Sequence, residues 1–198
     1  NGATGTVPTI SNKKAGETFS LPSTTLYKEW HEFGGWDIWA RKYVIVGSLY
    51  FYGICRDEAF RARILDCMEK HVDYLIAKIG NGEGQKSILD TSAAWGGLNS
   101  STILEPVIEL YKLTGKQKFL DFGKYVLDQG GCHGGNLLEL AEADEIYPYQ
   151  YPQVKAYEMM SCFDGIIELY RVTSSAATRK ITSSAVLKAV DYINANYS

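Results

Sequence analysis

The pattern of apolar and polar positions predicts a protein built almost entirely from helices. Runs of alternating β-branched residues are scarce, so we expect no substantial sheet. A short helix is expected over 136–143, followed by a loop rich in Tyr and Pro at 146–153. Apolar residues recur three and four positions apart, the spacing of one helix face, over residues 37–55, 57–79, 101–113, 117–129, 156–172 and 180–196.

Capping residues suggest where several of these helices begin and end. Glycine follows the helices at Thr114-Gly115 and at Gln129-Gly130, and glycine tolerates the left-handed conformation that often ends a helix. Asn99-Ser100-Ser101 offers side chains that can cap the third helix. Pro106 lies early in that helix and is expected either to kink it or to move its start.

The helices fall into a repeat of about 59 residues, which predicts a repeated supersecondary unit. Trp36 and Trp95 are also 59 positions apart. Each unit contains two helices, so the body should consist of three consecutive helical hairpins. Their first helices should run parallel, with their N-terminal ends on one rim. Matching positions in the three units are Tyr52, Tyr111 and Tyr170, and, in the same register, Ile54, Leu113 and Val172.

Length and charge exclude several classes of protein. The chain has 198 residues, enough for one domain, which we place at 26–198 after a flexible N-terminal segment at 1–25. The formal net charge is -3 and there is no basic stripe, which argues against a nucleic-acid partner. No apolar run approaches the roughly 20 residues of a membrane-spanning helix.

The cysteines form no CxxC pair and match no zinc-ribbon spacing. We expect Cys55, Cys67, Cys132 and Cys162 to be free and mostly buried thiols. The run 130–135, with Cys132 beside His133, is expected to be a turn, because zinc would need further ligands. No metal site and no cofactor are therefore predicted within this chain.

Aromatic and polar residues at the predicted rim suggest a carbohydrate site. Indole rings stack on the C–H face of a sugar, while charged and amide groups bind its hydroxyls. Trp36 and Trp95 could provide the rings, and Asp37, Asn99 and Lys155 the hydrogen bonds. Helix N-termini would add partial positive charge on the same side.

A purely structural role explains some of the same residues. Trp36 and Trp95 could cap the core between hairpins, and Asp37 could be an N-cap. Trp30 and Trp39 are expected to be packing residues. Arg41 and Lys42 could lie either on a solvated helix face or on the rim.

Glycoside cleavage needs two carboxyl groups about 5–5.5 Å or 6.5–9.5 Å apart, according to the stereochemical outcome. Candidate carboxyls near the starts of first helices are Glu32, Asp37, Glu105 and Glu158. For Glu105 and Glu158 the alternative is an acidic residue favoured by the helix dipole.

Five motifs together resemble the β-L-arabinofuranosidase-type glycoside hydrolases, glycoside hydrolase family 127 and its relatives. The resemblance covers about residues 28–198, and its most specific part is the pair of blocks at 155–162 and 165–173. The motifs are WDIWARKY at 36–43, LNSSTILEP at 98–106, LYKLTG at 110–115 with FLDF at 119–122, KAYEMMSC at 155–162 and GIIELYRVT at 165–173.

The resemblance implies an (α/α)6 toroid, of which three hairpins would be half. It also implies exo-cleavage of plant or microbial glycans by a bacterial enzyme that is periplasmic or secreted, with its export signal upstream. Relatives use a zinc-bound cysteine thiolate and a glutamate, which lie beyond the third hairpin. We therefore expect a fragment that is inactive alone, with zinc only in a full-length relative.

Only substrate-facing roles carry over to this chain, and Cys162 does not match the zinc-bound cysteine. Helices left open at the edges of a half-toroid would expose apolar surface, which predicts a homodimer. The residues that keep a substrate-facing role under the resemblance are Trp36, Asp37, Asn99, Lys155 and Glu158.

Two other functions remain open. One is a non-catalytic helical-repeat module that binds carbohydrate or protein, for which rim aromatics would suffice. The other is a different α/α-barrel enzyme, such as an unsaturated glucuronyl hydrolase or a sugar epimerase. That enzyme would need a histidine or aspartate pair in the funnel, and the only histidines are His31, His71 and His133.

Overall fold

The structure, a computed structural model, describes residues 36–92 and 95–173 together with 188, 191 and 195. This part of the chain is mostly helical, which confirms the predicted all-α class. Its one small sheet is the antiparallel pair of β1 (Gly131–Cys132) and β2 (Gly135–Asn136). The predicted segment at 1–25, Trp30 and Glu32, and all but three residues of the helix predicted over 180–196 lie outside the described residues.

The long helices begin and end close to the predicted positions. The main difference is the helix predicted over 101–113, which begins only at Leu104 and follows a separate short turn of helix. The helices are α2 (Asp37–Ile54), α3 (Glu58–Lys78), α4 (Leu98–Ser101), α5 (Leu104–Thr114), α6 (Gln117–Asp128), α7 (Leu137–Ala143) and α8 (Ala156–Thr173), with 3-10 turns at Ile88–Thr91, Trp95–Gly97 and Pro148–Gln150.

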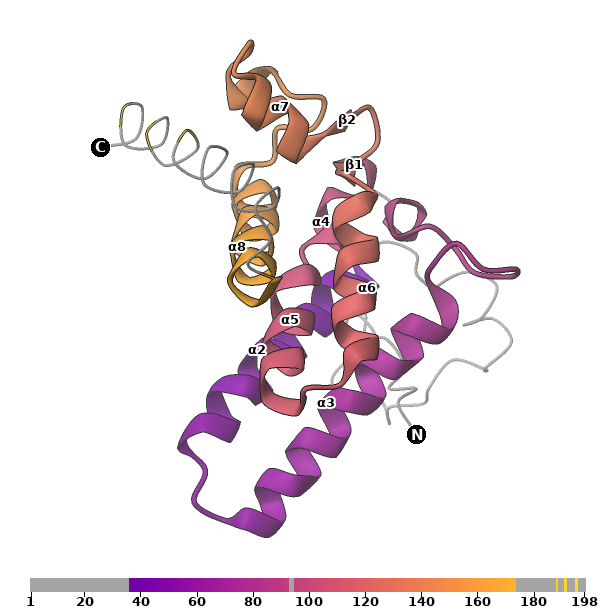
Figure 1. Ribbon diagram of the computed structural model, residues 1–198, viewed down its shortest axis with the longest axis vertical. Helices are drawn as coiled ribbons and strands as arrows, with labels where there is room; N and C mark the ends of the chain where they lie inside the picture. Colours follow the sequence, from indigo (N-terminus) through magenta and orange to yellow (C-terminus); the bar gives the residue numbers. More distant parts are fainter. Residues whose placement is uncertain (1–35, 93–94, 174–187, 189–190, 192–194, 196–198) are drawn as a thin grey trace, which may run out of the picture.

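Helices α2 and α3 form a hairpin and lie side by side along their length (Figure 1). Asp57 is the N-cap of α3. Its carboxylate accepts a hydrogen bond from the backbone N–H of Phe60 at 3.0 Å. The apolar stripes of the two helices supply Ile45, Val72 and Leu75 to the core.

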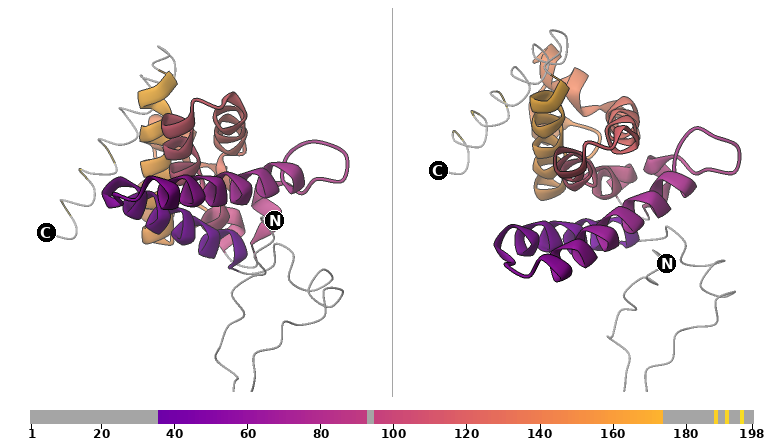
Figure 2. Two further views of the ribbon diagram at one scale, coloured as in Figure 1. Left: turned by 90° about the horizontal axis from the view of Figure 1, so that it is seen from below. Right: turned by 60° about the horizontal axis from the view of Figure 1, so that its bottom comes forward.

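A second hairpin joins α5 to α6. Gly115 ends α5 in the left-handed conformation with φ 65°, and its N–H donates to the carbonyl of Tyr111, as the sequence predicts. Helix α5 is the centre of the molecule, since it packs against α6, α8 and α2. The hairpin of α2 and α3 crosses one side of the group formed by α5, α6 and α8 (Figure 2).

The bounds of the helices keep the spacing seen in the sequence. Helices α2, α5 and α8 end at Ile54, Thr114 and Thr173, and α3 and α6 begin at Glu58 and Gln117. These ends and starts are 59 or 60 residues apart. Five of the six long helices that the sequence predicts therefore lie within the described residues, while the hairpin repeat stays a prediction.

The segment that precedes α5 corrects one prediction. Asn99-Ser100-Ser101 does not cap α5, because these residues form α4 and the N-cap of α5 is Ile103, which makes no side-chain capping bond. Pro106 sits in the first turn of α5, where proline is tolerated. No helix in the described part of the chain has the length and apolar character needed to span a membrane.

Candidate functional site

The N-terminal turns of α2, α5 and α8 meet at one place. Lys42 Nζ of α2 lies 3.1 Å from Glu105 Oε2 of α5. The hydroxyl of Tyr43 donates to the hydroxyl of Tyr157 on α8 at 2.7 Å. These two contacts bring the starts of three helices together, although the helices are distant in sequence.

Aromatic rings in contact with one another extend from this junction to the protein surface. The ring of Trp39 lies 6.1 Å from that of Trp36, 5.1 Å from that of Tyr43 and 5.6 Å from that of Tyr157, each edge to face. The outer members remain open to solvent, with Trp36 49% and Tyr157 59% exposed. Trp39 is half-buried and packs among the others, as the sequence predicts.

Asp37 does not face solvent. Its carboxylate accepts a hydrogen bond from Arg41 Nε at 3.2 Å, and both side chains are buried. Arg41 Nη1 in turn donates to His71 Nδ1 of α3 at 3.3 Å. The N-cap of α2 is Trp36 rather than Asp37. The suggestion that Asp37 caps α2 is therefore wrong, and Asp37 ties α2 to α3 through Arg41.

His71 belongs to this interior network. Burial lowers the pKa of its imidazole, and the positive charge of Arg41 lowers it further. A neutral ring whose Nδ1 accepts from Arg41 is consistent with both effects.

The sequence allows Lys42 and Arg41 either a solvated helix face or the rim, and in the structure both are buried. Lys42 Nζ lies 5.9 Å from the ring centroid of Trp39 and 5.7 Å from that of Tyr43. Lys42 is therefore a buried cation within the aromatic and acidic junction.

Trp95 and Asn99 lie in the connector between α3 and α5, residues 79–103, and Lys155 directly precedes α8. Lys155 Nζ sits 5.5 Å from the ring centroid of Trp95, and both side chains are exposed. Asn99 is buried and accepts a hydrogen bond from the hydroxyl of Ser92. Trp95 and Lys155 are thus available to a ligand, whereas Asn99 helps to hold the connector.

Glu158 is the most unusual of the predicted site residues. It is 2% exposed, and its Oε2 atom has no hydrogen-bond partner among the described residues. Burial and the contact with Tyr157 raise the pKa of the Tyr43 hydroxyl, and nearby carboxylates, including that of Glu158, raise it further. A buried acceptor without a partner costs free energy, so its presence calls for a compensating role.

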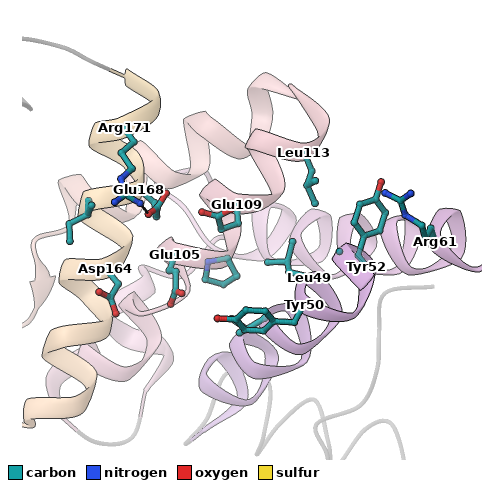
Figure 3. Close-up of a pocket in the computed structure, with 14 residues that line it drawn as sticks. Leu49, Tyr50, Tyr52, Arg61, Glu105, Glu109, Leu113, Asp164, Glu168 and Arg171 are labelled. Atoms are coloured by element: carbon teal, nitrogen blue, oxygen red, sulfur yellow. Dashed lines mark hydrogen bonds and ion pairs between the residues drawn. The ribbon is translucent and has the colours of Figure 1, made fainter. Parts of the chain in front are cut away.

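A cavity of about 670 Å³ opens between α2, α5 and α8 (Figure 3). This volume is within the range of small-molecule sites. Its lining combines apolar and aromatic side chains with both acidic and basic ones. The lining residues are Val46, Leu49, Tyr50, Tyr52, Gly53, Arg61, Glu105, Pro106, Glu109, Leu113, Asp164, Ile167, Glu168 and Arg171.

Most of the charges that line or flank this cavity are already paired. Lys112 Nζ lies 2.6 Å from Glu109 Oε1 and 2.9 Å from Glu168 Oε2. Arg171 also pairs with Glu168, and Arg61 pairs with Glu58 outside the lining. Glu105 and Asp164 lie one helical turn earlier on α5 and α8, and neither of them pairs with Lys112 or Arg171.

Asp164 differs from the other carboxylates of the cavity. No hydrogen bond or ion pair joins it to another described residue within contact distance. Burial raises the pKa of its carboxyl, and the negative charge of Glu105 raises it further, while Lys42 acts in the opposite direction.

The zinc implied by the family resemblance does not fit the described residues. They contain no group of three or more His, Cys, Asp and Glu side chains that could hold a metal ion. All four cysteines are free, but only Cys132 and Cys162 are buried, which corrects the expectation for Cys67 and Cys55. Burial raises the pKa of both buried thiols, and each thiol donates to a backbone carbonyl, which does not suit a thiolate ligand.

The turn around His133 is the β1–β2 hairpin. His133 Nε2 lies 2.9 Å from Asp90 Oδ1, and its backbone N–H donates to the carbonyl of Gly96. This arrangement agrees with the turn that the sequence predicts.

Sequence reasoning missed several residues of the site. Tyr157 could have been found, because it stands directly before Glu158 at the helix start. Tyr50 and Asp164 carried no signal, because only the packing of α2 and α8 around α5 places them on one cavity.

The fold and the site define an all-helical protein with open aromatic rings and buried charges where three helices begin. Comparison with models of protein families, with curated protein sequences and with solved structures finds no match to this chain. The resemblance to β-L-arabinofuranosidase-type glycoside hydrolases stays a prediction that rests on the sequence motifs.

Proposed function

We propose that this chain provides a sugar-binding wall in an α/α-barrel glycoside hydrolase of the β-L-arabinofuranosidase type. The observation that carries the proposal is the junction where α2, α5 and α8 begin. There the open rings of Trp36 and Tyr157 adjoin the ion pair of buried Lys42 with half-buried Glu105 and the buried carboxyl of Glu158.

Each part of this junction suits a sugar. An open indole or phenol face packs against the apolar face of a sugar ring, while its edge binds hydroxyls through charged groups. Lys155 over Trp95 offers a second exposed pair of cation and ring near the start of α8. The 59-residue spacing of the helices supports the further proposal that the hairpins belong to an (α/α)6 toroid.

The proposal includes the expected setting of such an enzyme. Its substrates would be plant or microbial glycans, met in the periplasm or outside a bacterial cell. The apolar side chains exposed on α2 support the proposal of a homodimer, because an open edge of a helical array needs a cover.

Hydrolysis of a panel of aryl glycosides, β-L-arabinofuranoside included, tests the enzymatic part. The assay uses the full chain after circular dichroism has shown that it is helical. Release of the aryl group, abolished in Glu105→Gln or Glu158→Gln, would place the chemistry within this chain. A helical chain that binds oligosaccharide without releasing the aryl group would support a sugar-binding wall only.

The second candidate is a non-catalytic carbohydrate-binding module. One observation favours it: Asp37 and Glu105 at the junction are each held by a buried cation, Arg41 and Lys42. Carboxylates paired with buried cations in this way stabilise the packing of the helices and are not free to act in catalysis. Trp36→Ala should weaken oligosaccharide binding about tenfold in either case, whereas Trp36→Phe should lose less. Unchanged affinity in Trp36→Ala, measured by calorimetry, would contradict a role for this ring.

A further inference from the structure

The cavity between α2, α5 and α8 is separate from the aromatic rings at the surface, and its chemistry is different. The rings of Trp36 and Tyr157 do not line it. Glu105 belongs to both, since it pairs with Lys42 on one side and lines the cavity on the other. The cavity is therefore a second place at which a ligand could contact the same wall.

One end of the cavity gathers oxygen atoms. In Figure 3 the carboxylates of Asp164 and Glu105 and the hydroxyl of Tyr50 lie at the same end, away from Arg61 and Leu113. These three side chains come from α8, α5 and α2, so the packing of three helices creates the arrangement.

The charge at this end is negative after pairing. Lys42 is the cation nearest to the two carboxylates, and it lies against Glu105 at 3.1 Å. Asp164 has no cation within contact distance among the described residues, and its side chain is exposed, so a ligand can reach it. Partial burial and the charge of Glu105 raise the pKa of the Asp164 carboxyl. A ligand cation placed beside Asp164 would supply the missing partner.

Apolar side chains adjoin the acidic end. Pro106 follows Glu105 in α5, and Leu49 and Ile167 line the cavity from α2 and α8. A ligand that presents an apolar ring face together with a positive group would meet both kinds of surface.

We propose that this cavity binds a sugar that carries a free primary ammonium group, with the ammonium beside Asp164 and Glu105 and the ring against Tyr50, Leu49 and Pro106. The inference rests on the proposed function, because it names the substrate class for the same wall. A neutral N-acetylated sugar would present no cation and would leave Asp164 without a partner.

Isothermal titration calorimetry with two oligosaccharides of equal length tests the proposal. One is a fully deacetylated glucosamine oligomer and the other its N-acetylated counterpart. The deacetylated oligomer should bind about tenfold more tightly, because one hydrogen bond between charged groups raises the affinity by about that factor. Asp164→Asn should remove the difference.

Asp66→Asn is the matched control, because it removes the same charge from an exposed site on α3, where Asp66 pairs with Lys70. Its affinities should equal those of the unchanged chain. An equal loss in both variants would attribute the preference to net charge alone and overturn the site. Circular dichroism of both variants shows that they are folded.

The pH dependence of the affinity for the deacetylated oligomer gives a second test of the same site. Asp164 faces Glu105 from α5, Lys42 from α2 and Glu168 on its own helix. The deacetylated oligomer should lose affinity as the pH falls and Asp164 takes up a proton. This loss should begin at a higher pH than an ordinary aspartate would give, and Asp164→Asn should abolish it.

A third probe, cyclohexylamine, separates this inference from the proposed function. Equal binding of the two oligomers overturns the ammonium site and leaves a sugar-binding wall. Binding of cyclohexylamine that depends on Asp164, with no binding of either oligomer, overturns the sugar as ligand and contradicts the proposed function. No binding of any probe overturns both.

Discussion

Single side chains in this protein show where stability and ligand binding compete. Glu158 is buried with an oxygen atom that lacks a partner, and Asp164 carries a carboxyl whose pKa is raised. The oxygen of Glu158 that lacks a partner costs free energy in the folded chain, whereas Asp164 is exposed and can be reached by a ligand. Residues of this kind are expected at sites that act on a ligand, because the ligand supplies the missing partner.

Asp164→Asn should raise the free energy of unfolding at pH 7. Because the pKa of Asp164 is raised in the folded chain, its contribution to stability is present below the ordinary pKa of an aspartate and lost as the pH rises through the raised value. The variant should therefore gain stability at neutral pH and little or none near pH 4. Urea unfolding at several pH values measures this, and a gain that does not vary with pH would contradict it.

Glu158→Met should also stabilise the chain, by roughly 1–3 kcal/mol, the cost of a buried polar group that lacks a partner. Methionine has a similar length and no acceptor to satisfy. Thermal unfolding of this variant beside Glu158→Gln measures the effect, since glutamine keeps a polar group in the same place. A loss of stability in Glu158→Met would show that the carboxyl has a partner after all.

Among the elements, α8 approaches the first turn of α5 closely at Gly165. A Cβ atom there would lie 2.7 Å from the Cβ atom of Leu104 and 2.8 Å from the backbone nitrogen of Glu105. The absence of a side chain at this point lets α8 approach the first turn of α5, which places Asp164 and Glu105 near each other.

Gly165→Ala should destabilise the chain by about 1–3 kcal/mol, because the added methyl group would overpack this contact. Gly47→Ala on α2 is the control, since its added Cβ would meet nothing within 4 Å. That control should gain up to about 1 kcal/mol from helix propensity. Equal effects in the two variants, measured by urea unfolding, would contradict the close contact.

At the scale of the whole molecule, α2 presents apolar side chains to solvent. Val44, Phe51 and Ile54 are all exposed, Ile54 by 76%. Exposed apolar side chains gathered on one helix are typical of an interface. The arrangement supports the proposed homodimer through an open edge.

Sedimentation velocity over a range of concentrations should show a dimer. The double variant Val44→Lys with Ile54→Lys should weaken association at least about tenfold, because lysine at an apolar interface leaves a charge unpaired. Ala77→Lys at an exposed position on α3 is the control and should leave association unchanged. A monomer at every concentration would show that α2 is not the interface.

The helices of this protein follow from local patterns in its amino-acid sequence. Spacing of apolar residues is a local property, so the bounds of α2, α3, α6 and α8 follow from it closely, and Gly115 ends α5 where it was expected. Asn99 shows the limit of local reasoning: a capping residue by type, it is buried in α4, because packing against the connector outweighs its local preference.

Only the tertiary structure decided which polar groups meet. Asp37 looked like a rim residue but turns inward to Arg41, while Lys42 crosses to Glu105 of another helix. Asp164 lies on the cavity because α8 approaches α5 at Gly165. Partners, burial and pKa shifts depend on distances between residues far apart along the chain, and periodicity along a sequence does not contain those distances.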